Sequence, residues 1–147
     1  MPICRNKMLY LVRRIRHKWR RIYLASSSIN GPISVWELGK ERHMVFAEGL
    51  TYPQSVIFTK GSWSELKREY WGRLIHRPFQ VPHRPRILVL GLGGGTVVNL
   101  AHRLLQPESI TAVELDPVVV EVAMIYMGLG NIPNLEIRIA DVHAALA

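Results

Sequence analysis

Residues 87–99 read ILVLGLGGGTVVN. Four branched apolar residues lead directly into a segment in which Gly91, Gly93, Gly94 and Gly95 leave the backbone bare. Glycine loses more conformational entropy on folding than any other residue, so a dense cluster of it needs a structural reason. A buried strand followed by such a loop and then a helix is typical of α/β proteins, where the bare backbone lets a ligand approach the start of the helix.

The alternation of strand and helix continues from this loop to residue 147. The pattern predicts strands at RILVLG (86–91), SITAVELD (109–116) and LEIRIAD (135–141), with helices at TVVNLAHRLL (96–105) and PVVVEVAMIYMG (117–128). The first strand is a continuous apolar run, which predicts a parallel strand covered on both faces. Right-handed crossovers then predict an α/β fold with a doubly wound, Rossmann-like parallel sheet that is incomplete at its C-terminal end.

The preceding half of the chain has a different pattern. RIYLASS (21–27), PISVWEL (32–38) and ERHMVFAEG (41–49) predict a small antiparallel β-hairpin layer, and SWSELKREYWGRLIH (62–76) has the apolar spacing of a helix. Three prolines in RPFQVPHRPR then mark a linker. We therefore divide the chain into a basic arm (1–21), the hairpin layer (22–60), the helix and proline-rich linker (61–85) and a Rossmann-like half-domain (86–147).

Charge and composition narrow the functional classes. The chain has 147 residues, 48% of them hydrophobic, and its apolar runs are too short for a membrane span. Cys4 is the only cysteine, and no secretory signal is recognisable, so we predict a cytoplasmic protein. The net charge of +8 lies entirely in residues 1–21, where a basic amphipathic helix is predicted. Its candidate partners are an anionic membrane or nucleic acid, and the alternative is a solvated arm whose apolar side packs on its own domain or on a partner protein.

Two acids follow the predicted strands at the same edge as the glycines. Glu114 lies about 20 residues after the loop, at the tip of the second strand, where a carboxylate can accept hydrogen bonds from both hydroxyls of a ribose. Asp141 lies at the tip of the third strand. A nucleotide-type cofactor is the predicted ligand, and no metal site is expected. The alternatives are a tight strand-to-helix turn for the glycines and, for either acid, a helix N-cap or a solvated loop residue. We assign Asp116, directly before Pro117, to a helix N-cap.

The pattern excludes two common nucleotide sites and resembles a third. Thr96 stands where a dinucleotide fingerprint needs glycine or alanine, and no Gly-Lys-Ser/Thr follows the loop. The order G-x-G-x-G, Glu, Asp is similar to the S-adenosylmethionine site of class I enzymes. RPRILVLGLGGGTVVNLAHRL, ITAVELDPVVVEVA and NLEIRIAD together resemble the spermidine synthase (polyamine aminopropyltransferase) family and its relatives. The resemblance covers roughly residues 30–147, since GLTYPQS and EYW also fit that family's N-terminal β-domain.

This resemblance implies a transferase that uses decarboxylated S-adenosylmethionine or S-adenosylmethionine as co-substrate and a small-molecule amine as acceptor. It implies that Glu114 binds the ribose and Asp141 the adenine. Gly94 aligns with the family's aspartate that holds the amine of the donor's tail. Tyr70 matches the tyrosine of a Tyr-His-Glu substrate motif whose other two positions here are Trp71 and Gly72, and Gln54 matches a substrate-side glutamine.

The family's catalytic base follows a fourth strand, and this sequence stops at Ala147, after the third. We therefore expect no catalytic residue in this chain and no activity from it alone, as for a truncated gene product or fragment. The family's fourth strand also pairs with its first, so residues 87–90 are predicted to have an open edge, which a homodimer of a complete small domain would close. A methyltransferase, favoured by Gly94, and a non-catalytic interaction module are the alternative functions.

Overall fold

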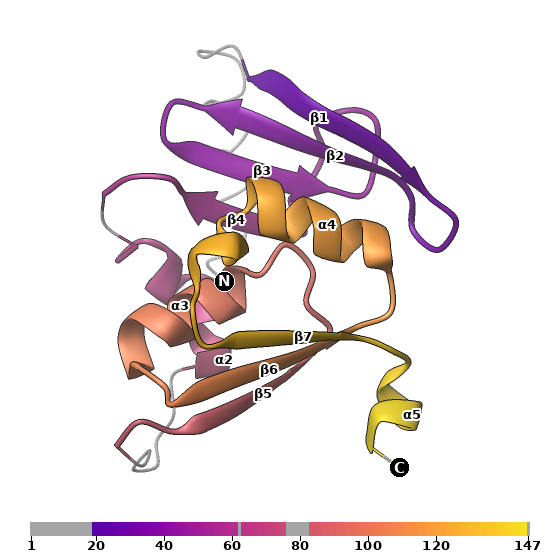
Figure 1. Ribbon diagram of the computed structural model, residues 1–147. Coiled ribbons are helices and arrows are strands. Elements are labelled where there is room, and N and C mark those ends of the chain that lie inside the picture. Colours follow the sequence, from indigo (N-terminus) through magenta and orange to yellow (C-terminus); the bar gives the residue numbers. More distant parts are fainter. Residues whose placement is uncertain (1–18, 62, 76–82, 147) are drawn as a thin grey trace, which may run out of the picture.

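The computed structural model describes residues 19–61, 63–75 and 83–146. It contains two β-sheets with the helices α3 and α4 between them (Figure 1). The predicted basic arm lies outside the described residues except for its last residues. Arg20 and Arg21 of that arm belong to the first strand, where Arg20 forms a 3.0 Å ion pair with Glu37 of the neighbouring strand.

The N-terminal sheet is antiparallel and has four strands in sequence order. They are β1 (Arg20–Ser27), β2 (Gly31–Leu38), β3 (Glu41–Val45) and β4 (Ser55–Phe58). The predicted hairpin layer is confirmed for the first three strands. β4 was not predicted, because a run of four apolar or small residues after Pro53 is too short to show a period.

The C-terminal sheet is parallel, with the order β5-β6-β7. Its elements are β5 (Arg86–Leu90), α3 (Thr96–Leu105), β6 (Ser109–Glu114), α4 (Pro117–Tyr126), the 3-10 turn η2 (Leu129–Asn131), β7 (Leu135–Ile139) and α5 (Val142–Leu146). The predicted Rossmann-like alternation is therefore confirmed. Its helices share a hydrophobic core with the N-terminal sheet, in which Ile33, Val35 and Met44 lie in one cluster with Leu100 and Val122.

The helix predicted over residues 62–76 is wrong in its extent. The described part of this segment forms a 3-10 turn, η1 (Leu66–Arg68), and a short helix, α2 (Tyr70–Ile75). Glu69 between them is extended, with ψ 178°, which breaks the helical hydrogen-bond ladder. Glycine at position 72 lets α2 pass close to the backbone of Lys67. A Cβ at this position would lie 2.1 Å from the carbonyl oxygen of Lys67.

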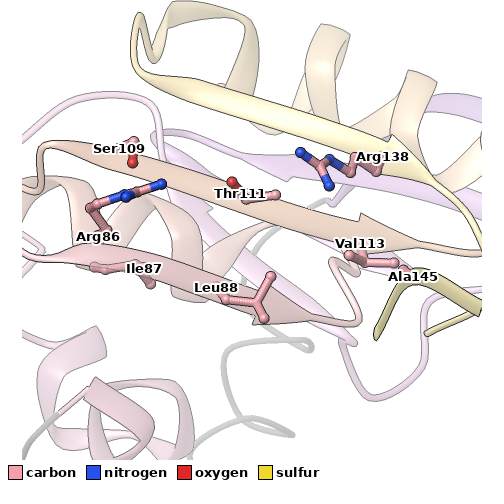
Figure 2. A pocket seen from close by; sticks show the side chains of 8 residues that line it. All are labelled: Arg86, Ile87, Leu88, Ser109, Thr111, Val113, Arg138 and Ala145. Carbon is pink, nitrogen blue, oxygen red and sulfur yellow. The ribbon is translucent and has the colours of Figure 1, made fainter. Parts of the chain in front are cut away.

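The prediction that β5 is covered on both faces is also wrong. Leu88 and Leu90 point away from α3 and α4, and they are 52% and 47% exposed. In the part of the chain that the structure describes, this open face of the sheet is covered only near its carboxyl end, where Ala145 of α5 lies close to Val113 (Figure 2). An apolar run indicates burial on two faces only when elements are present to cover both.

Within the described residues, no helix is long and apolar enough to cross a membrane.

Candidate functional site

The glycine loop lies at the carboxyl end of β5, where ligands bind in sheets of this type. The Gly91 amide donates to the Val113 carbonyl at 2.9 Å, which carries the strand pairing one residue past β5. Gly91 has φ 81°, a left-handed conformation that favours glycine, and an added Cβ would meet no atom within 4 Å. The loop is thus open to a ligand at Gly91.

Two other glycines of the loop are required by packing within the protein. A Cβ at Gly95 would lie 2.6 Å from the side chain of Leu129, and one at Gly94 would lie 2.6 Å from the Cβ of Ser55. Neither distance is tolerated between real atoms. The sequence pattern predicts a ligand or a tight turn for this cluster, and the contacts of Gly94 and Gly95 within the protein add a packing reason for glycine at both positions.

Glu114 holds the loop against the tip of β6. One carboxylate oxygen accepts from the amides of Leu92, at 2.9 Å, and Gly93, at 3.3 Å. The other accepts from the amides of Leu115, at 2.9 Å, and Asp116, at 3.0 Å. A carboxylate has about four acceptor positions, so backbone donors occupy all of them. A ribose bound here would have to displace some of these donors.

Asp141 caps the helix that follows β7. Its Oδ1 accepts from the amides of His143, at 2.8 Å, and Ala144, at 3.3 Å. The neighbouring Ala140 amide donates to the Glu114 carbonyl at 3.0 Å, which joins the tips of β6 and β7. The three strand tips with the glycines, Glu114 and Asp141 therefore form one edge, as the sequence predicts.

The N-terminal sheet contacts this edge through the hydroxyl groups of Ser55 in β4 and Thr96 in α3, and the sequence analysis predicts neither contact. Ser55 at the start of β4 is 3% exposed, and its Oγ accepts from the Gly94 amide at 2.7 Å. Thr96 Oγ1 accepts from the Val56 amide and donates to the Val56 carbonyl, both at 2.9 Å. These contacts join positions about 40 residues apart, so no local pattern could reveal them.

The Ser55 hydroxyl is expected to stabilise the glycine loop. In Ser55→Ala the buried Gly94 amide loses its acceptor, which should lower the free energy of unfolding by about 1–3 kcal/mol. Urea unfolding measures this loss, and amide hydrogen exchange should show faster exchange at Gly94. Ser26→Ala, at an exposed serine of β1, is the matched control and should change the stability by less than about 0.5 kcal/mol. An unchanged exchange rate at Gly94 would contradict the role of Ser55.

Asp116 joins the first hairpin to the start of α4. It is 1% exposed, and its carboxylate accepts from the Ser27 hydroxyl, from Asn30 Nδ2 at 2.6 Å and from the Val118 amide at 2.9 Å. The predicted N-cap before Pro117 is thus confirmed. Burial is the largest influence on the pKa of Asp116 and raises it, but the hydrogen bonds from Ser27, Asn30 and the helix amides together hold this pKa below its ordinary value.

The two predicted substrate-side residues, Gln54 and Tyr70, lie in different parts of the structure. Gln54 is exposed and precedes Ser55 directly, so the start of β4 brings it beside the glycine loop. Tyr70 begins α2 and is 68% exposed, with its ring 6.4 Å from the ring of Trp71. At Gly72 the close approach of the Lys67 carbonyl leaves no room for the glutamate of the family motif.

The described residues form no metal site, and the two grooves described below lie away from this edge. Among the described residues, no group of three histidine, cysteine, aspartate or glutamate side chains is placed to hold a metal ion. Two open grooves of about 420 and 1,120 Å³ lie on the open face of the C-terminal sheet and beside the amino ends of its strands. Neither is lined by the glycine loop, Glu114 or Asp141.

Comparisons with known proteins agree with this architecture. The chain is similar to the spermidine synthase of Thermotoga maritima, with 20% identity and a TM-score of 0.53, over 83% of this chain and 42% of that one. A spermidine synthase in complex with the transition state analogue AdoDATO matches with 19% identity and a TM-score of 0.53, over 85% of this chain and 47% of that one. Over the matched residues, the chain therefore has the fold of these spermidine synthases.

A curated relative matches over a shorter stretch. The eEF1A lysine and N-terminal methyltransferase homolog of Drosophila pseudoobscura pseudoobscura is 42% identical over 55 residues, which are 37% of this chain and 8% of that protein. The chain therefore spans a small part of this relative and less than half of the two solved spermidine synthases. No family model matches the sequence.

Proposed function

We propose that the sheet edge formed by the glycine loop, Glu114 and Asp141 binds the adenosyl group of a sulfonium donor. The chain would then be the donor-binding part of a transferase. The observation that carries the proposal is the joining of the glycine loop and Glu114 at adjacent strand tips. In such a transferase the acceptor nucleophile attacks the alkyl carbon of the sulfonium, the carbon–sulfur bond breaks, and its electron pair stays on the neutral thioether. Catalysis by this edge consists of positioning.

Position 94 favours S-adenosylmethionine as the donor over its decarboxylated form. The tail of decarboxylated S-adenosylmethionine carries an ammonium group alone, whereas the tail of S-adenosylmethionine carries an ammonium group and its own carboxylate. The decarboxylated donor therefore depends more on a carboxylate from the protein. Gly94 supplies none, and Ser55 leaves no room for one. This supports methyl transfer, which is also the activity that the printed name of the Drosophila relative gives.

Aminopropyl transfer is the second candidate. The similarity to the two spermidine synthases extends over 83% and 85% of this chain, which is more than the C-terminal half alone. The antiparallel N-terminal sheet that packs on the donor edge is thus part of the shared fold. Gln54, beside the glycine loop, is the substrate-side residue that this function would use, and Tyr70 is the second.

Calorimetric titration with S-adenosylmethionine, its decarboxylated form and methylthioadenosine tests the proposal. We expect all three to bind through the adenosyl group, with S-adenosylmethionine preferred over the decarboxylated donor. Glu114→Gln replaces one carboxylate oxygen by an amide group that cannot accept from the loop or from ribose. It should weaken binding of each compound about ten-fold or more.

The matched control is Glu108→Gln, which changes a carboxylate at the opposite end of β6 and should leave affinity unchanged. Binding of NADH without binding of any adenosyl sulfonium compound would overturn the donor assignment. Tighter binding of the decarboxylated donor than of S-adenosylmethionine would support aminopropyl transfer instead.

A further inference from the structure

The larger groove lies beside the amino ends of the strands of the C-terminal sheet, at the opposite end from the glycine loop. Its volume is about 1,120 Å³, and its walls come from β4, the end of α3, the loop before β5 and the loop between η2 and β7. The last described helix, α5, follows the carboxyl end of β7, at the other end of the sheet (Figure 1). The groove is therefore separate from the proposed donor edge.

The side chains that line this groove carry a positive charge. Arg42, Arg84 and Arg103 line it, and Glu108 is the acid among its described lining residues. The charge of Arg42 is already paired, because its Nε donates to Glu37 at 2.8 Å. In the part of the chain that the structure describes, neither Arg84 nor Arg103 has an ion pair. These two arginines therefore make the groove attractive to an anion.

Arg103 is held in place by an aromatic ring. Its Cζ lies 4.6 Å from the centre of the Trp63 ring, and Trp63 is 8% exposed. Stacking of a guanidinium on an aromatic face restricts the side chain, while the N–H groups in the plane of the guanidinium stay free to donate to a carboxylate. A carboxylate that binds Arg103 therefore costs little side-chain entropy.

Two unusual backbone conformations occur at the same groove. Among the described residues, Arg84 and Gln106 are the non-glycine residues with positive φ, 53° and 45°, and both line the groove. Left-handed backbones are uncommon for long side chains, and such strained residues cluster at binding sites. Their shared location indicates that this part of the surface meets a requirement other than stability.

The aromatic residues of the groove decide which kind of anion fits. Single-stranded nucleic acids stack their bases on open aromatic faces. The two described aromatic residues that line the groove offer no such face, because Trp63 is covered by Arg103 and Phe58 is 6% exposed. Arginine matches carboxylates, and the exposed amide groups of Gln106 and Asn131 match the polar groups of a peptide backbone. This chemistry favours an acidic peptide over a nucleic acid.

We propose that this groove binds an acidic segment of a partner protein, whose carboxylates pair with Arg84 and Arg103. The binding does not depend on the donor site, because the groove and the glycine loop share no residue. Both arginines are exposed, so each ion pair contributes little. We therefore expect a dissociation constant in the high micromolar range at low ionic strength, which rises with added salt.

A heteronuclear NMR titration of the full chain with a hexaglutamate peptide tests the proposal. The basic arm attracts the same peptide, and signals assigned to single residues separate its binding from binding in the groove. We expect the indole signal of Trp63 and the amide signals of Arg103 and Asn131 to shift in a saturable manner.

Variants of the two arginines test their roles. The double variant Arg84→Gln and Arg103→Gln should raise the dissociation constant measured from these signals about ten-fold. Arg86→Gln is the matched control, because Arg86 is an exposed arginine two positions from Arg84 that lines the other groove (Figure 2). It removes the same charge and should change the dissociation constant by less than about two-fold.

Arg84→Gly separates binding from stability. Glycine adopts a positive φ without strain, so this variant should unfold at no lower temperature than the wild type. It lacks the guanidinium, so it should bind hexaglutamate about three-fold more weakly or worse. A loss of affinity in this variant is then not a loss of fold.

Four results would overturn the proposal. They are peptide-induced shifts confined to the basic arm, a double variant that binds as tightly as the wild type, an Arg86→Gln variant weakened as much as the double variant, and an Arg84→Gly variant with unchanged affinity. An oligothymidylate that shifts the groove signals at lower concentration than hexaglutamate would also overturn it, because the occupant would then be a nucleic acid.

Discussion

Asp116→Ala is expected to lower the free energy of unfolding by about 3 kcal/mol or more at neutral pH. The substitution removes a helix N-cap, which contributes about 0.5–2 kcal/mol. It also leaves the Ser27 hydroxyl and the Asn30 side chain without their charged acceptor, and hydrogen bonds to charged groups contribute about 1.5–3 kcal/mol each. Urea unfolding at pH 7 measures the loss.

The pH dependence of stability gives a second measurement on Asp116. Its pKa is lower in the folded protein than the value of about 3.9 in the unfolded chain, so its contribution is complete above that value. The contribution is lost as the pH falls through the lower pKa of the folded state. Asp116→Asn keeps one acceptor oxygen but cannot titrate, so its stability should depend less on pH below about 4. Equal acid sensitivity of wild type and Asp116→Asn would contradict this role.

Gly94→Asp is expected to destabilise the protein by about 3 kcal/mol or more and to abolish donor binding. Overpacking of a core costs about 1–3 kcal/mol, and a buried unpaired carboxylate adds to this. The cause is the Ser55 Cβ, 2.6 Å from the position that the new Cβ would take, with the Met127 methyl group at 3.2 Å. Thermal unfolding and calorimetric titration measure the two effects.

Two further variants isolate that cause. Gly49→Asp is the matched control, because a Cβ there would meet nothing within 4 Å, and it should change stability by less than about 0.5 kcal/mol. Ser55→Gly combined with Gly94→Asp removes the obstructing atoms and should recover part of the stability. Under the proposed function, the double variant should also shift preference toward the decarboxylated donor. A single variant as stable as the wild type would show that Ser55 does not restrict this position.

The parts of the site that were predictable are those encoded by local pattern. The glycines at the end of β5 and Glu114 at the tip of β6 follow apolar runs that indicate buried strands, so their meeting at one edge followed from parallel topology. Asp116 was predictable because an aspartate directly before Pro117 is a strong signal for a helix start. What the sequence could not indicate is that Glu114 is already occupied by four backbone amides.

The parts that were missed depend on contacts between distant segments. β4 is too short to be periodic, and the role of Ser55 exists only because β4 packs on the glycine loop. The split of the helix over residues 62–76 depends on the extended backbone of Glu69, which no residue pattern there predicts. The sequence analysis predicts cover on both faces of β5, and this is wrong for the face that carries Leu88. An apolar run shows which residues tolerate burial but not which elements are present to bury them.

The Thr96 hydroxyl has a consequence for how the chain unfolds. One oxygen satisfies both the amide and the carbonyl of Val56, so the border of the N-terminal sheet is completed by a helix of the C-terminal one. If residues 86–146 came apart first, β4 would lose this partner, and its side chains, which are buried in one core cluster with those of α3 and α4, would be exposed to water. We therefore expect the two sheets to unfold in one cooperative transition.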